Sequence, residues 1–182
     1  MPTYSDFLRG LRDDPLSVSA PTPSGPALAR AIAAQVNPQR PGLVVELGAG
    51  TGTVTAALLQ HGIPTERLVL FESIPNFHQL LSRQFPRAKI FCADAFQFDR
   101  FLPGDATIAA VISGLPLLNH PVARRAQLIE TALDCQGLGG QFVQLSYGWW
   151  PPVPAGAHLS LSKLTVWRNL PPAHVWVYRR RH

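Results

Sequence analysis

The first residues in this 182-residue sequence whose types and spacing suggest chemistry lie in the stretch VVELGAGTGT. An apolar run ends at the carboxylate of Glu46. Glycines then follow at alternate positions, namely Gly48, Gly50 and Gly52. Glycine lets the backbone turn tightly and lets a ligand approach it closely. The helix expected from Thr53 onward points its free amide groups at the same place. The stretch therefore predicts a small-molecule site built largely from backbone groups.

The spacing of the glycines separates two cofactor classes. Dinucleotide-binding loops use GxGxxG to seat a pyrophosphate, and Thr53 stands where that pattern needs its third glycine. An acid at the strand end followed by GxGxG is typical of class I methyltransferases, whose loop surrounds the methionine and ribose of S-adenosylmethionine. A glycine turn without a ligand, or a dinucleotide site, stays an open alternative. The predicted cofactor contacts in this loop are Glu46, Gly48, Ala49, Gly50, Thr51, Gly52 and Thr53.

Two further acids follow the next two expected strands. Glu72 lies about twenty residues beyond the glycine loop, where a carboxylate accepts hydrogen bonds from both ribose hydroxyls. Ser73 follows it and is included in the predicted cofactor site. Asp94 is placed to accept a hydrogen bond from the adenine amino group, with Ala95 beside the ring. Capping of a helix N-terminus is a rival explanation for Asp94.

The candidate acceptor site follows the fourth expected strand, in ISGLPLLNHP at residues 112–121. In open α/β sheets, ligands bind at this edge. Amine methyltransferases often carry here a short Asn-Pro-Pro-aromatic loop, or a related one, whose backbone carbonyl orients the attacking nitrogen. This sequence has GLPL instead, without the Asn or the aromatic ring. Ser113 and Gly114 are the candidate catalytic contacts, and Ser113 is also a candidate cofactor contact.

Short β-rich runs alternate with helix-like runs, which predicts βαβ units and a parallel sheet buried on both faces. The expected strands are Leu43–Glu46, Arg67–Glu72, Lys89–Cys92, Ala106–Ile112 and Gly140–Ser146, and the expected helices between them are Thr53–Gln60, Pro75–Phe85 and Val122–Leu133. Lys163–Trp167 and Val175–Tyr178 are expected to form a closing antiparallel pair, and a helix over Ala27–Val36 precedes the core. The predicted fold is α/β and Rossmann-like, of the class I methyltransferase type. It has a mostly parallel seven-stranded sheet, helices on both faces, a C-terminal antiparallel hairpin and one domain over residues 1–182.

Several segments together resemble a known family, the bacterial phospholipid N-methyltransferases of the Rhodobacter type. These enzymes convert phosphatidylethanolamine stepwise to phosphatidylcholine. Three short stretches distinguish this family better than the glycine loop does, because any class I methyltransferase shares that loop. They are SGLPLL, the SYG at the end of the fifth strand, and RNLPPAHVW. The matching stretches are APTPSGPALARAIA (20–33), VVELGAGTGTVTAALL (44–59), VISGLPLLNHP (111–121), GGQFVQLSYG (139–148) and VWRNLPPAHVWVYRR (166–180).

The resemblance implies an amine acceptor, so aromatic faces that bind a methylated cation become candidates. Tyr147 is the first candidate, either as that face or for polarising the amine, and Tyr4, Trp149 and Trp150 follow it. Arg168 is a candidate partner for the lipid phosphate. Ser24 is a candidate substrate contact, although Gly25 stands where the family commonly has a second serine. Local packing of the tryptophan pair and a solvated surface arginine are the rival explanations.

The N-terminal segment predicts how such a substrate is reached. Residues 1–14 carry apolar side chains on one stripe with Arg9 and Arg12 off it, as in an amphipathic helix that lies on an anionic membrane. An ordinary helix folded onto the core is the alternative. The net charge of +5 also favours an anionic partner. Without a signal peptide or a spanning segment, the expected location is cytoplasmic and peripheral on the inner membrane face. No metal-ligand spacing is recognised.

Three rival functions stay open. An rRNA adenine N-methyltransferase has a similar cofactor loop, but it clamps a flipped base with an Asn and an aromatic ring that this loop lacks, so nucleic acid is not the expected partner. A soluble small-molecule methyltransferase would share every cofactor residue. A non-catalytic cofactor-binding module is the third, and the intact glycine loop and acids argue against it. The favoured function is transfer of methyl groups from S-adenosylmethionine to phosphatidylethanolamine and its methylated derivatives.

Overall fold

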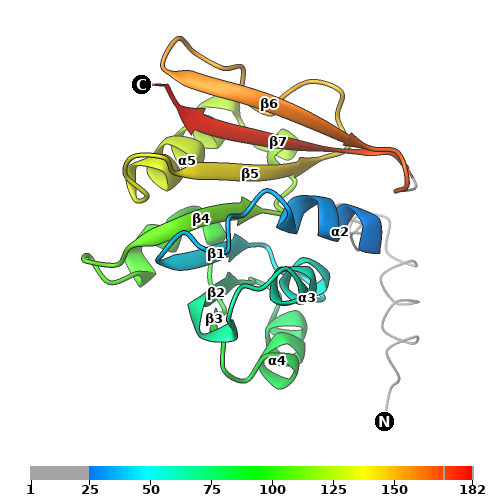
Figure 1. The fold of residues 1–182 in the computed structure, drawn as a ribbon, viewed down its shortest axis with the longest axis vertical. Helices are drawn as coiled ribbons and strands as arrows, with labels where there is room; N and C mark the ends of the chain where they lie inside the picture. Colours follow the sequence, from blue (N-terminus) through cyan, green and yellow to red (C-terminus); the bar gives the residue numbers. More distant parts are fainter. Residues whose placement is uncertain (1–24, 170, 182) are drawn as a thin grey trace.

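Five parallel strands form the centre of the molecule, and two further strands extend the sheet on one side (Figure 1). The computed structural model describes residues 25–169 and 171–181. The parallel strands are β1 (Leu43–Leu47), β2 (Leu68–Phe71), β3 (Lys89–Phe91), β4 (Ile108–Ser113) and β5 (Gln141–Ser146). β6 (Leu159–Val166) and β7 (Ala173–Arg180) complete the order β3-β2-β1-β4-β5-β7-β6. This order confirms the predicted mostly parallel seven-stranded sheet with its C-terminal antiparallel hairpin.

Helices cover both faces of the sheet, as predicted. α2 (Pro26–Ala33), α3 (Thr53–Gln60) and α4 (Pro75–Gln84) contribute buried side chains to one apolar cluster. α5 (Val122–Asp134) and the 3₁₀ helix η2 (Ala95–Phe101) contribute to a second cluster on the opposite face. The central strands are buried on both faces because their side chains alternate between the two clusters. Two short 3₁₀ helices, η1 (Thr65–Arg67) and η3 (Leu117–Asn119), lie in connections.

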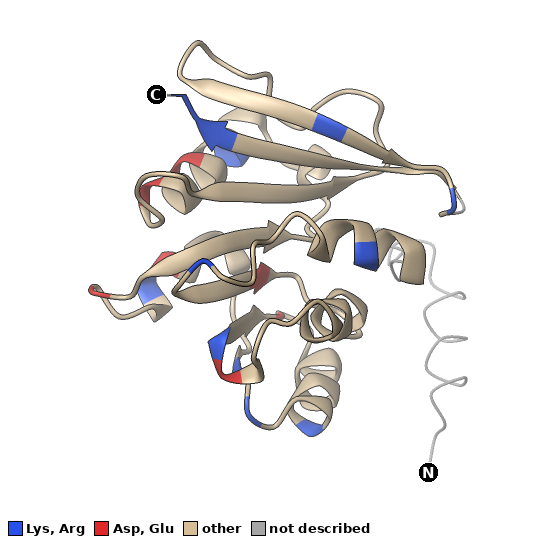
Figure 2. Ribbon diagram, viewed as in Figure 1, with Lys and Arg blue, Asp and Glu red and all other residues tan. Residues whose placement is uncertain are grey.

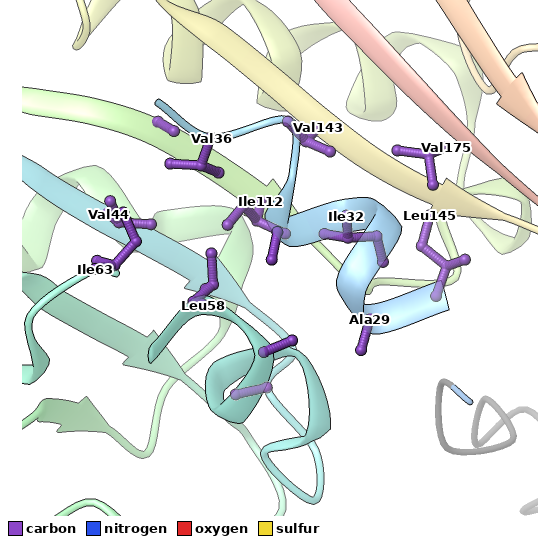
Figure 3. Packing of buried hydrophobic residues seen from close by; sticks show 14 of the residues in the cluster. Ala29, Ile32, Val36, Val44, Leu58, Ile63, Ile112, Val143, Leu145 and Val175 are labelled. Carbon is purple, nitrogen blue, oxygen red and sulfur yellow. The ribbon is translucent and has the colours of Figure 1, made fainter. Parts of the chain in front are cut away.

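The first apolar cluster ties the N-terminal helix to the sheet (Figure 3). Ile32 of α2 and Leu58 of α3 are almost fully buried. They join a cluster that includes Ile112 and Val143, which are register partners on β4 and β5. Burial of this apolar surface is the main stabilising contribution that α2 makes. The consequence for function is a rigid sheet whose carboxyl edge keeps its loops in fixed positions.

Some predicted boundaries differ from the structure, for physical reasons. The hairpin strands are longer than expected because β6 and β7 pair along eight positions, from Leu159 opposite Arg180 to Val166 opposite Ala173. The helix expected over Ala27–Val36 instead spans Pro26–Ala33. The amides of Gln35 and Val36 bond three residues back rather than four, which tightens the last turn.

The membrane predictions from the sequence are only partly covered by the structure. The amphipathic helix predicted over residues 1–14 lies outside the described residues. Within the described residues, none of the helices has the length and apolar character needed to cross a bilayer.

Candidate functional site

The glycine loop connects β1 to α3 at the carboxyl edge of the sheet. The Gly48 and Ala49 amides both donate to the Phe71 carbonyl of β2, at 2.8 and 3.1 Å, which fixes the start of the loop. Gly48, Gly50 and Gly52 have φ angles of +74°, +55° and +80°, a region that side chains disfavour. The sequence therefore encodes a loop conformation that requires glycine at all three positions.

The three glycines differ in what surrounds them. A Cβ on Gly48 would lie 2.9 Å from a Leu115 methyl carbon, and one on Gly52 would lie 2.6 Å from the Phe85 ring. A Cβ on Gly50 would meet nothing within 4 Å. Gly48 and Gly52 are thus enclosed by protein, whereas Gly50 faces open space. A ligand can approach the backbone at Gly50 without contact with a side chain.

The two predicted threonines of the loop lie beside this open position. Thr51 and Thr53 are half-buried, and their hydroxyl oxygens are 3.2 Å apart. Thr53 is the first residue of α3, so its backbone amide has no partner within the helix. Ala49, in contrast, is buried in the first apolar cluster. The cofactor contacts that the sequence predicts for these three residues stay predictions.

Glu72 links the end of β2 to the glycine loop. One carboxylate oxygen accepts the Gly50 amide at 2.8 Å, and the other accepts the Ile74 amide at 2.8 Å. The residue is only 6% exposed. A carboxylate has about four acceptor positions, so roughly two are left for further donors. Two hydroxyl groups on adjacent carbons, as in a ribose, match that remaining capacity.

Glu46 lies deeper, at the end of β1. Its Oε2 atom accepts a hydrogen bond from the Thr55 hydroxyl of α3 at 2.7 Å. Burial raises the pKa of Glu46 to about 8; Thr55 opposes this rise and the nearby charge of Glu72 adds to it. Two acids therefore lie close together under the glycine loop. A bound cation would favour the ionised form of Glu46.

Asp94 has two roles within the protein itself. One carboxylate oxygen caps η2 by accepting the Phe96 amide at 3.0 Å, so the rival capping role is real. The other oxygen pairs with Arg124 at 3.3 Å, and that guanidinium lies 4.1 Å from the centre of the Phe96 ring. Ala95 is buried beside it, whereas Ser73 is exposed. The adenine contact of Asp94 stays a prediction.

The candidate acceptor loop packs directly against the glycine loop. The Gly114 amide donates to the Leu47 carbonyl at 2.9 Å, and a Cβ on Gly114 would lie 3.0 Å from the Gly48 carbonyl oxygen. The hydroxyl of the fully buried Ser113 accepts the Leu115 amide at 3.3 Å. The structure thus brings the predicted pair Ser113 and Gly114 against the predicted cofactor loop.

Sequence reasoning missed a buried glutamine that holds this loop. The side-chain amide of Gln144 on β5 donates to the Leu115 carbonyl at 3.0 Å. The other amide atom of Gln144, Oε1, has no partner among the described residues, and neither does Nε1 of its cross-strand neighbour Trp176. A polar residue in the middle of a buried strand was the available signal. Thr55 carried no such signal, because its role depends on the position of Glu46.

The predicted substrate residues are not brought into one contact. Tyr147 is half-buried and packs on the cluster that contains α2. The Trp149 ring packs instead 4.8 Å from the His174 ring and 6.2 Å from the Trp167 ring, measured between centroids. Arg168 is exposed. Tyr4 and Ser24 lie outside the described residues. Within the described chain, no group of three or more His, Cys, Asp or Glu side chains is arranged to hold a metal ion.

Comparison with known proteins adds one sequence relative. No protein-family model matches the chain. The chain is 27% identical over 170 residues to the ornithine lipid N-methyltransferase of Singulisphaera acidiphila, which covers 90% of this chain and 88% of that protein.

Solved structures share the fold. TrmN from Thermus thermophilus superposes with a TM-score of 0.67 at 20% identity over 86% of this chain, which spans 49% of that structure. Magnesium protoporphyrin IX methyltransferase from Synechocystis PCC 6803, solved with bound S-adenosylmethionine, gives a TM-score of 0.64 at 14% identity over 98% of this chain and 92% of that one. The chain has the class I methyltransferase fold.

In a class I methyltransferase fold, as in other open α/β sheets, the ligand site lies at the carboxyl edge where the strand order reverses. Here that point lies between β1 and β4, because β2 follows on one side and β5 on the other. The glycine loop leaves β1 there and the acceptor loop leaves β4, so the two face each other across it. The glycine loop and the acceptor loop therefore lie at the edge where this fold binds ligands, and the contacts of individual residues with a cofactor or an acceptor stay predictions.

Proposed function

We propose that this protein transfers methyl groups from S-adenosylmethionine to the amine of a membrane lipid. The observation that carries the proposal is the position of the Glu72 carboxylate. It accepts the Gly50 amide beside open space and can still accept hydrogen bonds from two ribose hydroxyls. The lipid N-methyltransferase relative supports an amine lipid as the acceptor. Phosphatidylethanolamine and its methylated derivatives are the acceptors that the sequence resemblance favours, with phosphatidylcholine as the final product.

The described residues fit such a cofactor. Bound S-adenosylmethionine would supply an electrophilic methyl group on a sulfonium ion. Glu72 would bind the ribose hydroxyls, and the backbone at Gly50 would lie against the methionine portion. Glu46 lies beside Glu72, and a bound cation would favour its ionised form, so the pair suits a positively charged ligand. Asp94 would accept the adenine amino group with the oxygen lone pairs that Phe96 and Arg124 leave free.

The acceptor side requires positioning more than acid–base chemistry. Methyl transfer is an in-line displacement, so alignment of the amine and exclusion of water supply much of the rate enhancement. Ser113 and Gly114 would set the floor on which the amine lies, and Gln144 would hold the Leu115 carbonyl in place. We propose Tyr147 as the aromatic contact for the amine, which becomes bulkier and finally cationic with each transfer.

The proposed membrane contact has two parts. Residues 1–14 are proposed to lie on an anionic bilayer, and the protein is proposed to be peripheral on the cytoplasmic side. A variant without these residues should bind anionic vesicles more weakly. Unchanged binding would contradict the role given to this segment.

A substitution at Glu72 tests the proposed cofactor site. Glu72→Gln replaces one acceptor oxygen by a donor group, so the affinity for S-adenosylhomocysteine should fall by roughly tenfold to hundredfold, because hydrogen bonds to a charged group contribute about 1.5–3 kcal/mol. Isothermal titration calorimetry measures this affinity. Glu66→Gln is the matched control, since Glu66 is an exposed acid whose ion pair among the described residues is with Arg87. Equal affinities in all three proteins would contradict the site.

The acceptor is tested with labelled cofactor and separate substrates. The enzyme should be incubated with S-adenosylmethionine labelled in its methyl group and with one candidate acceptor at a time. The candidates are phosphatidylethanolamine in detergent micelles, an ornithine lipid, rRNA and small soluble amines. Label in the phosphatidylethanolamine fraction is the expected result. Label only in the ornithine lipid would replace the proposed head group by that of the ornithine lipid, and the acceptor would still be a membrane lipid. Label only in RNA or only in soluble amines would overturn the lipid proposal.

A further inference from the structure

Three tryptophans lie exposed in two loops at the carboxyl edge of the sheet. Trp149 and Trp150 follow β5, and Trp167 follows β6. They are 61%, 82% and 68% exposed. We refer to these three side chains as the tryptophan surface. Exposed tryptophans are uncommon in soluble proteins, and such clusters mark sites of interaction.

The backbone that carries the first two tryptophans is firmly anchored. The buried Tyr178 hydroxyl donates to the Val153 carbonyl at 2.9 Å and accepts the Val153 amide at 3.1 Å. Arg125 donates to the Pro152 carbonyl at 2.7 Å, and Lys163 donates to the Trp149 carbonyl at 3.2 Å. These bonds hold the loop in one position while its indole rings stay in solvent. Their exposure is therefore a feature of an ordered loop.

The part of the chain after Asp134, which carries the three tryptophans, has charged residues of one sign. No Asp or Glu occurs after Asp134, whereas five basic residues do, and the other eleven basic residues are balanced by the eleven acidic ones. The net charge of +5 thus equals the number of basic residues in this segment. Arg179, Arg180 and Arg181 lie at the far end of β7, where Arg180 pairs with Glu130 and Asp134. Lys163 and Arg168 are therefore the two basic residues of this segment that lie near the tryptophans. Figure 2 shows basic residues on β6 and β7 and no acidic residue on β5, β6 or β7. Lys163 lies 5.0 Å from the centroid of the Trp149 ring, and Arg168 adjoins Trp167 in the chain.

The tryptophan surface adjoins the acceptor loop. A Cβ on Gly148 would lie 2.8 Å from a methyl carbon of Leu118, so the loop after β5 packs on the residues that follow the acceptor loop. Leu118 is itself 48% exposed and continues the apolar area. The start of β7 lies at the same edge, because His174 pairs with Ser146 at the end of β5. A partner bound to this surface would therefore lie next to the entrance for the acceptor.

We propose that the tryptophan surface, with Lys163 and Arg168, docks on an anionic lipid bilayer. Tryptophan suits the boundary between head groups and acyl chains, since its ring is apolar and its N–H stays near water. Basic side chains beside it are attracted to anionic head groups. The inference rests on the proposed function, because a lipid amine must reach Ser113 and Gly114 from a membrane. Docking by this edge would present the amine to the site without removing the lipid from the bilayer.

Vesicle binding tests the docking surface without any catalysis. Vesicles of phosphatidylcholine and phosphatidylglycerol contain no primary amine to methylate, and no cofactor is added. The double variant Trp150→Ala/Trp167→Ala should bind them roughly tenfold or more weakly in co-sedimentation, because two large apolar side chains are lost. Arg168→Gln should weaken binding by about fivefold, an effect that added salt removes. Leu138→Ala is the matched control, an 83% exposed leucine before β5 at the opposite edge.

Tryptophan emission reports directly on the same surface. The chain has four tryptophans, and the fourth, Trp176, is only 6% exposed. Vesicles with brominated acyl chains should quench the emission of the wild-type protein, and iodide should quench it only before vesicles are added. Shielding from iodide in the free protein would mean that another segment covers the tryptophans, which would overturn the proposal. Unchanged vesicle binding in the double variant, or an equal loss in Leu138→Ala, would also overturn it.

One assay separates this inference from the proposed function. With a short-chain phosphatidylethanolamine dispersed as monomers, Trp167→Ala should retain the wild-type kcat, and with vesicles its rate should fall in parallel with its binding. If the wild-type protein methylated neither the monomeric nor the vesicular substrate, the proposed function would be refuted and the binding result would be unaffected. Parallel losses with monomeric and vesicular substrate would refute docking and leave the function intact.

Discussion

Glu46 shows how strongly a buried side chain depends on its surroundings. The carboxyl group lies under the glycine loop with the Thr55 hydroxyl as its hydrogen-bond partner and Glu72 nearby. Because burial disfavours the charged form, the pKa of Glu46 rises to about 8. Near neutral pH, a carboxyl group with that pKa is largely protonated until a cation arrives. Cofactor binding should therefore release a proton from this site.

The raised pKa of Glu46 predicts how stability depends on pH. Between pH 4.5 and about 8, the folded protein retains a proton that the unfolded chain has lost, so the free energy of unfolding falls as pH rises. The slope should reach about 1.4 kcal/mol per pH unit at most. Glu46→Gln removes this titration, so its urea unfolding free energy should vary less across the same window. Parallel curves for the two proteins would show that Glu46 does not titrate there.

Residue-scale prediction from the sequence succeeded where spacing along the chain fixes geometry. The order of the strand-end acids placed Glu72 at the glycine loop, because parallel strands carry their carboxyl ends to one edge. Sequence spacing could not find the hydrogen bond from Gln144 to Leu115, since Gln144 lies on β5, Leu115 lies in the loop after β4, and packing brings them together. For Asp94 the sequence indicated two roles, adenine binding and helix capping, and the structure shows the capping role.

At the scale of elements, the glycine loop combines two different requirements. All three glycines have positive φ, but only Gly48 and Gly52 are enclosed by neighbouring side chains. Gly50 keeps its space open and donates its amide to Glu72. Stability and ligand access are thus assigned to different glycines of the same loop.

Two alanine variants separate these requirements. Gly52→Ala adds left-handed strain and a clash with Phe85, so it should lower the unfolding free energy by about 2–5 kcal/mol. Gly50→Ala adds only the strain, about 1–2 kcal/mol, but its methyl group occupies the space proposed for the cofactor. Thermal denaturation and calorimetry with S-adenosylhomocysteine measure the two effects. Tight binding by a folded Gly50→Ala protein would move the cofactor away from this position.

Element boundaries were predicted best where a strand lies in the centre of the sheet. β5 is buried at every position, and its expected range differs from the structure by one residue, Gly140. β6 lies at the sheet edge and is exposed at three consecutive positions, Ser162 to Leu164, and the sequence prediction began four residues late. An edge strand has weaker hydrophobic patterning, so its length is set by pairing with β7 and not by composition.

For the whole molecule, the sheet separates two apolar clusters that share every central strand. Ile32 of α2 belongs to one cluster and Ile129 of α5 to the other, and both are almost fully buried. Because the same strands support both clusters, neither face can lose its packing independently. The two halves of the core should therefore unfold together.

Truncations on the two faces test this coupling. Ile32→Ala and Ile129→Ala should each lower the unfolding free energy by about 2–5 kcal/mol, and each should leave a single transition. Leu138→Ala, an exposed position, should change it by less than about 0.5 kcal/mol. Far-ultraviolet circular dichroism and tryptophan emission, followed through the same denaturant titration, provide the check. Two separated transitions would show that one face melts alone.

The reversed direction of β7 has a practical consequence. The strand begins beside Ser146 and ends at Arg180, beside the start of β5, so the described chain leaves the sheet at the edge remote from the glycine loop (Figure 1). A biotin tag or a fluorophore joined after the last residue would be separated from the catalytic edge by the length of a strand. Immobilisation through such a tag would leave that edge facing the solution, which suits surface plasmon resonance with injected liposomes.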